Sequence, residues 1–495
     1  MRKVVIAFAS FAILALSTAA AEAQRDTLTL AMTLEPAPGL DPTMGPAAAI
    51  REITYANLFE GLTRIDRNAE IRPALAESWT VSADGMVYGF KLRQGVRFHD
   101  GTEFDSADVK YSLERAMAPD SRNAQKWIFA PIAKIETPDR YAVVVTLKRP
   151  AGNFLYGLGW GDAAMVAPET AANNSASPIG TGPFKFDRWV KGDSVELSRF
   201  DGYWRKDAVA LRRVTFRFIP DAQAQISALL AGDVDAVPIF AAPEAVEQFK
   251  TDKRFSVTVG ATEGETILAL NNQKPPFNDL RVRQALAHAV DRNALIAGAM
   301  SGYGTPIGSH FSPGHPAYVD LTGRYPYDPA KARALLAEAG HPNGLKATLR
   351  LPPPPYARRG GEIVAAQLSK VGIQVSIEPV EWAQWLDNVF QNKQFDMTII
   401  SHVEPMDIDK YAVDDYYFGY RNPRFKEVMA AIDRATDPAA QNRLYREAQT
   451  LLADDSVNVF LFQLSRITVA NADVIGLWQN VPLPANDLTE VSWRK

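Results

Sequence analysis

Short apolar strand-like segments alternate with well-signalled helices along almost all of this 495-residue chain. Residues 141–147 and 395–400 are apolar runs of the kind found in strands that are covered on both faces. Helices are expected to begin at Asp279 and at Asp328, because an aspartate suits the N-cap and Pro329 suits the first helical position. This alternation, without a long linker or a repeat, predicts two α/β lobes between which the chain crosses more than once.

Further elements follow the same signals. The proline run 352–355 predicts a short, stiff, extended piece. Additional strands are expected at 88–92, 214–218, 266–270, 347–351 and 374–377, and additional helices after Asp221 and from Pro438.

The first 23 residues have the pattern of a secretory signal peptide. Arg2 and Lys3 precede an apolar run over 4–16, and the segment ends in the A-x-A-like residues 21–23. The apolar run is shorter than the roughly 20 residues that a membrane span needs. We therefore expect cleavage after Ala23 and export of a soluble chain; the alternative is a retained membrane anchor.

Composition narrows the class of protein. The chain has no cysteine, which excludes disulfides, thiol catalysis and a lipid on an N-terminal cysteine, so a periplasmic location is expected. It has 53 Lys and Arg against 57 Asp and Glu, a net charge of −4, which argues against nucleic acid as a partner. We expect a monomer.

Catalytic signatures are missing from the sequence. There is no H-E-x-x-H, no G-x-S-x-G and no phosphate-binding P-loop. His99 precedes a turn and has no partners at metal-ligand spacing, so we expect no metal site and no cofactor. A hydrolase that uses a pair of carboxylates cannot be rejected on motifs, because acidic residues are plentiful.

A series of short motifs in a fixed order is the most specific signal in the chain. They are Asn57-Leu58-Phe59-Glu60-Gly61-Leu62, Pro73-Ala74-Leu75-Ala76-Glu77-Ser78-Trp79, the stretch 90–102, Gly180-Thr181-Gly182-Pro183-Phe184, Tyr203-Trp204, Ala231-Gly232-Asp233-Val234-Asp235, the stretch 277–286 and Tyr327-Asp328-Pro329. The series resembles the family-5 solute-binding proteins of ABC importers, which include dipeptide-, oligopeptide- and nickel-binding proteins. The resemblance covers essentially the whole chain after the signal peptide.

The resemblance implies a two-lobed α/β clamp of the type II, cluster C-like periplasmic class, with an extra subdomain on the first lobe. Lobe I is expected at 24–60, 183–270 and 471–495, the inserted subdomain at 61–182 and lobe II at 271–470. Two crossings near residues 270–272 and 464–469 would form the hinge. Such a protein is not an enzyme: it captures a solute between its lobes and delivers it to a membrane permease.

The loop 401–411 follows an expected strand at its carboxyl end, where ligands bind in α/β lobes. In peptide-binding relatives the matching loop carries an aspartate that pairs with the ligand's ammonium group. Here Glu404 or Asp407 falls near that position, and His402 stands where an aromatic residue is common. The resemblance therefore implies that these residues bind the solute; the alternative is that the acids are solvated loop charges.

Two further groups complete the expected pocket. Tyr356, Arg358 and Arg359 follow the proline run, and an arginine could bind a ligand carboxylate. Trp382 and Trp385 share a helix face, and either could line the pocket or belong to the core. An acid and an arginine suit a zwitterion such as a short peptide, an amino-acid conjugate or an opine. A metal chelate is the alternative implied by the nickel-binding relatives, and His402 would then matter most.

Overall fold

The computed structural model describes residues 25–404, 406–435 and 437–494, so the expected signal peptide lies outside the described residues. Aspartate N-caps form where the sequence predicts them: Asp279 accepts a hydrogen bond from the backbone of Arg281, and Asp328 from that of Lys331. The helices are α1 (Ala48–Thr54), α2 (Ser106–Met117), α3 (Lys126–Phe129), α4 (Phe154–Gly157), α5 (Ala222–Ala231), α6 (Val246–Thr251), α7 (Leu280–Ala289), α8 (Arg292–Met300), α9 (Pro329–Glu338), α10 (Pro355–Ser369), α11 (Trp382–Trp385), α12 (Pro423–Arg434) and α13 (Pro438–Asp454).

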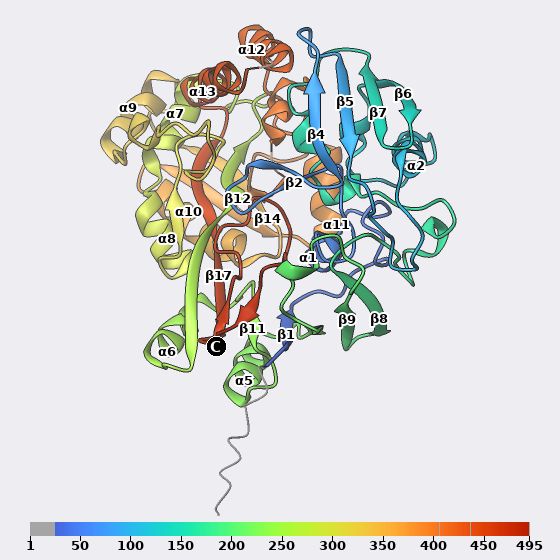
Figure 1. The fold of residues 1–495 in the computed structure, drawn as a ribbon. Helices are drawn as coiled ribbons and strands as arrows, with labels where there is room; N and C mark the ends of the chain where they lie inside the picture. The colour runs from blue at the N-terminus through green and yellow to red at the C-terminus, as the bar shows by residue number, and fades with distance from the viewer. Residues whose placement is uncertain (1–24, 405, 436, 495) are drawn as a thin grey trace, which may run out of the picture.

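One large sheet runs through the molecule (Figure 1). Its strand order is β15 (Ile373–Pro379), β14 (Leu345–Leu351), β16 (Met397–His402), β12 (Phe255–Leu270), β17 (Val459–Asn471), β11 (Ala236–Val237), β1 (Thr27–Met32), β10 (Arg213–Phe218), β9 (Ser194–Arg199) and β8 (Phe184–Val190), with β13 (Gly304–Pro306) paired to β17. The long antiparallel strands β12 and β17 lie in the middle of this sheet, where β12 pairs with β16 on one side and β17 pairs with β11 on the other. They are the path by which the chain joins its two halves.

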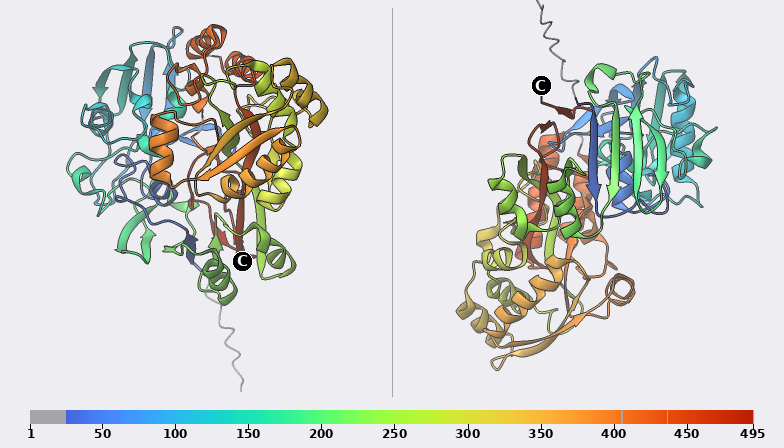
Figure 2. Two further views of the ribbon diagram at one scale, coloured as in Figure 1. Left: turned by 180° about the vertical axis from the view of Figure 1, so that it is seen from behind. Right: turned by 90° about the horizontal axis from the view of Figure 1, so that it is seen from below.

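The two halves stand apart when the molecule is seen from below (Figure 2, right). The blue to cyan elements lie on one side and the yellow to orange elements on the other. On the yellow side, α7, α8 and α10 pack around β14, β16 and the end of β12 and share one buried core. On the other side, β1, β10, β9 and β8 build a separate core.

A second sheet forms the upper right of Figure 1, and α2 packs against its strands β6 and β7. Its strands are β4 (Ala76–Val81), β5 (Val87–Leu92), β7 (Ala142–Leu147) and β6 (Ile132–Asp139), in that order. Their core runs from Tyr55 to Ala167 and also takes in Trp478, Val481 and Leu483 from the end of the chain.

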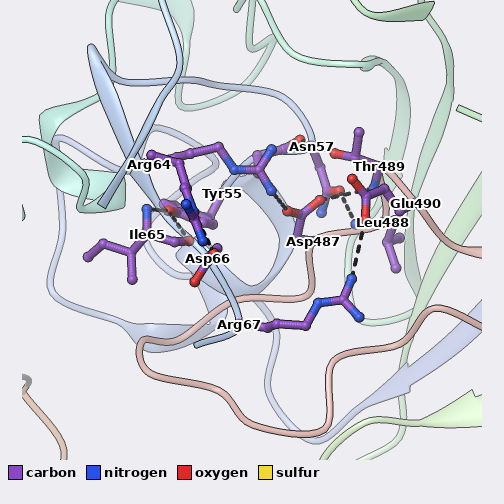
Figure 3. A network of polar contacts seen from close by, with 12 residues as sticks. Tyr55, Asn57, Arg64, Ile65, Asp66, Arg67, Asp487, Leu488, Thr489 and Glu490 are labelled. Carbon is purple, nitrogen blue, oxygen red and sulfur yellow. Dashed lines mark hydrogen bonds and ion pairs between the residues drawn. The ribbon is translucent and has the colours of Figure 1, made fainter. Parts of the chain in front are cut away.

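The end of the chain is tied to the hairpin of β2 (Thr63–Ile65) and β3 (Ile71–Pro73) by the polar network of Figure 3. Arg64 forms an ion pair with Asp487, and Arg67 forms one with Glu490. The last strands, β18 (Val474–Ile475) and β19 (Ser492–Trp493), pair with each other. The C-terminal tail thereby fastens the half that holds the second sheet.

The expected elements are present, with two differences. The strand expected at 266–270 is the end of the much longer β12. The proline run is extended only as far as Pro354, because Pro355 opens α10; Tyr356 and the two arginines after it therefore lie in the first turns of a helix.

Candidate functional site

A cleft of about 580 Å³ lies between the two halves of the molecule. We call it the cleft. Its walls come from two distant parts of the sequence, which is what a clamp requires. One wall is lined by Pro46, Arg51, Ala124, Gln125, Trp127, Asn153 and Trp160, and the other by Trp382, Trp385, Leu386, Phe390, Ile400, Ser401, His402, Val403, Glu404, Met406, Asp407, Asp409, Lys410, Tyr416 and Tyr417.

A buried polar chain forms the floor of the cleft on the side of β16. Nδ1 of His310 lies 2.8 Å from a Glu265 carboxylate oxygen, and its Nε2 lies 3.2 Å from Oδ1 of Asp407. Nδ1 of His402 lies 2.9 Å from Oδ2 of Asp407, and its Nε2 lies 3.0 Å from the Tyr417 hydroxyl. Both oxygens of Asp407 thus face imidazoles, and we refer to these five residues as the floor chain.

The charges of the floor chain follow from these contacts. Burial alone would lower the pKa of His310, but Glu265 and Asp407 raise it well above the usual value. Burial would raise the pKa of Asp407, but its contacts with His310 and His402 lower it strongly. Burial also opposes a charge on His402, yet the hydrogen bond to Asp407 raises its pKa above the usual value. Burial raises the pKa of the Glu265 carboxyl to about 8. The floor chain therefore favours the charged form of Asp407 and raises the pKa of both imidazoles that face it.

The opposite wall contains a second buried ion pair. Nε of Arg51 lies 3.3 Å from Oδ2 of Asp162, and the Arg51 guanidinium donates to the carbonyls of Gly45 and Pro46. Burial raises the pKa of Asp162 to about 6, although Arg51 opposes the shift. Within the described residues, neither carboxylate oxygen of Asp162 has a hydrogen-bond partner, and the indole nitrogen of Trp160 also has none. The floor chain also has two buried atoms without a hydrogen-bond partner among the described residues, Nδ1 of His310 and Oδ1 of Asp407, although each lies in an ion-pair contact.

The structure brings five of the predicted site residues to the cleft: His402, Glu404, Asp407, Trp382 and Trp385. Glu404 is exposed, whereas Asp407 is buried and faces the two histidines. Asp407 thus lies inside the floor chain, and its role as a residue that binds the solute stays a prediction. Trp382 is 43% exposed at the rim, and Trp385 is buried and donates its indole N–H to Thr398, 2.9 Å away.

The other three predicted residues do not line the cleft. Arg358 donates to the carbonyls of Pro352 and Val380, and so closes the turn that leads into α10. Arg359 lies 3.9 Å from Glu244 on the surface. Tyr356 is largely buried against the core of its lobe, and burial raises its pKa to about 12. Neither arginine is placed to bind a carboxylate in the cleft.

Sequence reasoning missed several residues of the site. Asp409 and Lys410 belong to the loop that the sequence singles out, and the Tyr416-Tyr417 pair that follows it was a usable signal. Arg51, Trp127 and Trp160 reach the cleft from the other half. Glu265 and His310 had no local signal at all, because their role comes from contacts between remote segments. The missed residues include Arg51, one partner of the opposite wall's ion pair.

The donor atoms of Glu265, His402 and Asp407 lie within 4.8 Å of one another, close enough to raise the question of a metal ion. A metal would need an unprotonated imidazole nitrogen facing it. Both nitrogens of His310 face carboxylates, and both nitrogens of His402 are hydrogen-bonded to Asp407 and Tyr417. Every imidazole nitrogen of His310 and His402 already faces a protein oxygen, so these residues do not fit a metal site.

Comparison with known proteins identifies the family to which this architecture belongs. The family "Bacterial extracellular solute-binding proteins, family 5 Middle" matches residues 70–423. The glutathione-binding protein GsiB of Escherichia coli (strain K12) is 29% identical over 446 residues, covering 85% of this chain and 86% of its own length. GsiB of Salmonella typhi has the same identity and coverage.

Solved structures agree with the fold expected from the sequence. AgaA of A. tumefaciens R10, in complex with agropinic acid, is 27% identical with a TM-score of 0.79, and 95% of this chain and 99% of that one are covered. DppA of Helicobacter pylori, in complex with the peptide STSA, is 27% identical with a TM-score of 0.80, at 95% and 98% coverage. The two-lobed α/β clamp is thereby confirmed. The chain belongs to family 5 of the bacterial extracellular solute-binding proteins, the substrate-binding components of ABC importers.

Proposed function

We propose that this protein captures a small zwitterionic solute, peptide-like or opine-like, in the cleft and delivers it to an inner-membrane ABC permease. The observation that carries the proposal is that the cleft is lined from both halves of the chain. A solute that contacts both walls is bound best when the halves close, so its binding energy shifts the balance toward the closed form. GsiB, AgaA and DppA, named for glutathione or solved with agropinic acid or a peptide, support this class of solute.

The lining of the cleft suits a zwitterion with an apolar part. Glu404 and Asp409 supply negative charge, and Arg51 and Lys410 supply positive charge. Asp409 is itself 3.1 Å from Lys410, so Glu404 is the acid without an ion pair among the described cleft residues. Aromatic rings from both walls, including Trp127 and Trp160 on one side and Phe390 on the other, offer apolar surface between these charges.

The hinge belongs at the irregular part of the β12–β17 pairing. Ala261 pairs with Ser465 and Glu265 with Gln463, so three residues of β12 stand opposite Leu464 alone. A bulge of this kind interrupts the ladder and lets the strands bend. A hinge near residues 270–272 agrees less well with the structure, because the Asn271 side chain donates to the carbonyl of Phe395 and the Asn272 side chain to that of Val457. We therefore move the boundary between the proposed lobes from residue 270 to the bulge.

The proposal also covers the location, processing and oligomeric state of the protein. Among the described residues, no helix is long and apolar enough to cross a membrane. We propose that the chain is exported to the periplasm after cleavage behind Ala23, carries no lipid anchor, acts as a monomer, binds no nucleic acid and turns over no substrate. Sequencing the N-terminus of protein from the periplasmic fraction should give Gln24 first.

Native mass spectrometry of protein purified without refolding, followed by calorimetry with glutathione, dipeptides and opines, tests the proposed function. At least one such compound should raise the melting temperature, because a ligand of the folded state stabilises it by mass action, and no compound should be consumed. Glu404→Gln should weaken a cationic or zwitterionic solute about tenfold, as expected for a charged hydrogen bond. Sustained product formation would instead indicate a hydrolase, and retention of a metal complex would indicate a chelate-binding protein.

A further inference from the structure

We propose that the floor of the cleft, formed by His402 and Tyr417, receives an anionic, hydrogen-bond-accepting group of the solute, such as a carboxylate, and not its ammonium group. This inference rests on the proposed function and gives the solute a direction in the cleft. It reverses the polarity that the resemblance to peptide-binding relatives implies for this loop.

Asp407 is the acid nearest the position where peptide-binding relatives hold an ammonium group. Its side chain is 7% exposed, with one oxygen 3.2 Å from His310 and the other 2.9 Å from His402. Oδ2 is occupied by the hydrogen bond with His402, and Oδ1 is buried against His310 without a hydrogen-bond partner among the described residues. Asp407 therefore belongs to the floor chain and does not present an open carboxylate edge to the cleft.

The two partners of His402 determine where its ring carries hydrogen atoms. Its Nδ1 faces the Asp407 carboxylate and must donate, because an ionised carboxylate only accepts. If Nε2 also carries a hydrogen, it donates to the oxygen of Tyr417, and the hydroxyl hydrogen of Tyr417 is released for another acceptor. In the part of the chain that the structure describes, His402 is the one hydrogen-bond partner of that hydroxyl. Tyr417 lines the cleft with only 1% of its surface exposed, so the missing acceptor must be an atom that reaches the bottom of the cleft when the solute binds.

Three acids face the imidazole of His402. The acids that face it are Asp407 and Glu404 from its own loop and Glu265 from β12, and they raise its pKa against the opposing effect of burial. His310, between Glu265 and Asp407, also has a raised pKa, and burial raises the pKa of Glu265 itself to about 8. The floor therefore favours positive charge on its two imidazoles, with Asp407 as the carboxylate between them, and the imidazole that lines the cleft is that of His402, hydrogen-bonded to Tyr417. An acceptor gains a charge-assisted contact there, whereas an ammonium group meets donors.

The first measurement needs no ligand. Histidine-labelled protein, exported and purified in full, is titrated by NMR from pH 5 to 9. We expect His402 to lose its proton above the ordinary histidine pKa of about 6.5, and Asp407→Asn to lower that midpoint. A His402 ring that is already neutral below pH 6.5 would overturn the inference, since the floor would then offer no free donor.

The second measurement uses matched probes: dipeptides and glutathione as free acids, as C-terminal amides and as N-acetyl derivatives, followed by calorimetry. Amidation should cost about tenfold in affinity (about 1.4 kcal/mol) and N-acetylation clearly less. Tyr417→Phe should remove most of the difference between acid and amide. Tyr411→Phe is the matched control, because its hydroxyl accepts from Asn458 within the same aromatic cluster and Tyr411 does not line the cleft.

The outcomes separate the two proposals. Loss of binding on N-acetylation, with amidation tolerated, would overturn the inference and leave the solute-binding function intact. If none of these probes binds, the peptide-like function is contradicted, and the NMR titration alone decides the protonation of the floor. Affinity for the free acid should also fall as the pH rises through the His402 midpoint, because binding then requires uptake of a proton.

Discussion

Asp162 and Asp407 are both buried aspartates beside the cleft, one in each half of the molecule, and their pKa values move in opposite directions. Burial raises the pKa of Asp162 to about 6, since Arg51 touches it through a single 3.3 Å contact. Burial acts on Asp407 as well, but His310 and His402 outweigh it and lower its pKa. The number of cationic partners, not the depth of burial, decides whether the charge is favoured.

The two carboxylates differ in the number of cationic groups that face them. Each oxygen of Asp407 faces its own imidazole and Oδ2 is hydrogen-bonded to His402, whereas Asp162 faces Arg51 alone; among the described residues, Oδ1 of Asp407 and both oxygens of Asp162 have no hydrogen-bond partner. The floor chain therefore keeps one arrangement before a solute arrives. The opposite wall, with the free indole N–H of Trp160, is better placed to gain contacts when the cleft fills.

The largest effect expected is on stability. Asp407→Asn leaves the two histidines without their shared anion and should lower the free energy of unfolding by about 3–5 kcal/mol, the usual cost of breaking a buried ion pair from one side. Asp162→Asn should cost only about 1 kcal/mol or less, because that carboxylate is poorly satisfied and Arg51 keeps two carbonyl partners. Urea denaturation at pH 7 measures both, and equal losses would erase the distinction between the two aspartates.

The pH dependence of unfolding sharpens the same comparison. The pKa of His310 is raised in the folded state, so its contribution is fully present below the unfolded value of about 6.5 and is lost as the pH rises toward the folded value. We expect the urea midpoint to fall between pH 7 and pH 10, and to fall less in His310→Gln. The lowered pKa of Asp407 predicts a separate loss as the pH drops below about 3.8. A profile unchanged by His310→Gln would argue against a charged floor chain.

The smallest effect concerns two buried tryptophans on the two walls. Trp385 donates its indole N–H to Thr398, whereas the indole N–H of Trp160 has no partner within residues 25–404, 406–435 and 437–494. Replacing either by phenylalanine removes a similar volume, but only Trp385→Phe also breaks a hydrogen bond. Trp385→Phe should therefore cost about 1 kcal/mol more than Trp160→Phe, the typical worth of such a bond. Denaturation of the two variants side by side gives the difference, and the reverse order would show that Trp160 is already satisfied.

Much of the fold could be predicted because its signals are local. Asp221, Asp279 and Asp328 cap helices through hydrogen bonds to backbone groups two or three residues away, so a short stretch of sequence specifies them. The apolar periods of β5 and β10 specify strands in the same way. The loop after β16 was also predictable as part of the site, because it follows the carboxyl end of a strand.

Roles that depend on remote partners could not be predicted. Arg358 and Arg359 have the chemistry of a carboxylate site, but α10 begins at Pro355 and turns Arg358 onto the carbonyls of Pro352 and Val380. Arg51, with no local motif, reaches the cleft instead. A side chain's direction depends on where its element packs, and that is a property of the whole core.

The α/β class, the family and the loop that carries the site follow from the amino-acid sequence, because each rests on residues close together in the chain or on the order of such residues. The role of Asp407 in that loop depends on the folded chain. Its charge is set by His310, which lies 97 residues earlier in the numbering, and by Glu265 behind it on β12. Electrostatic energy depends on distance in space, and in a buried site a few ångströms decide whether a carboxylate binds a solute or holds two histidines in place.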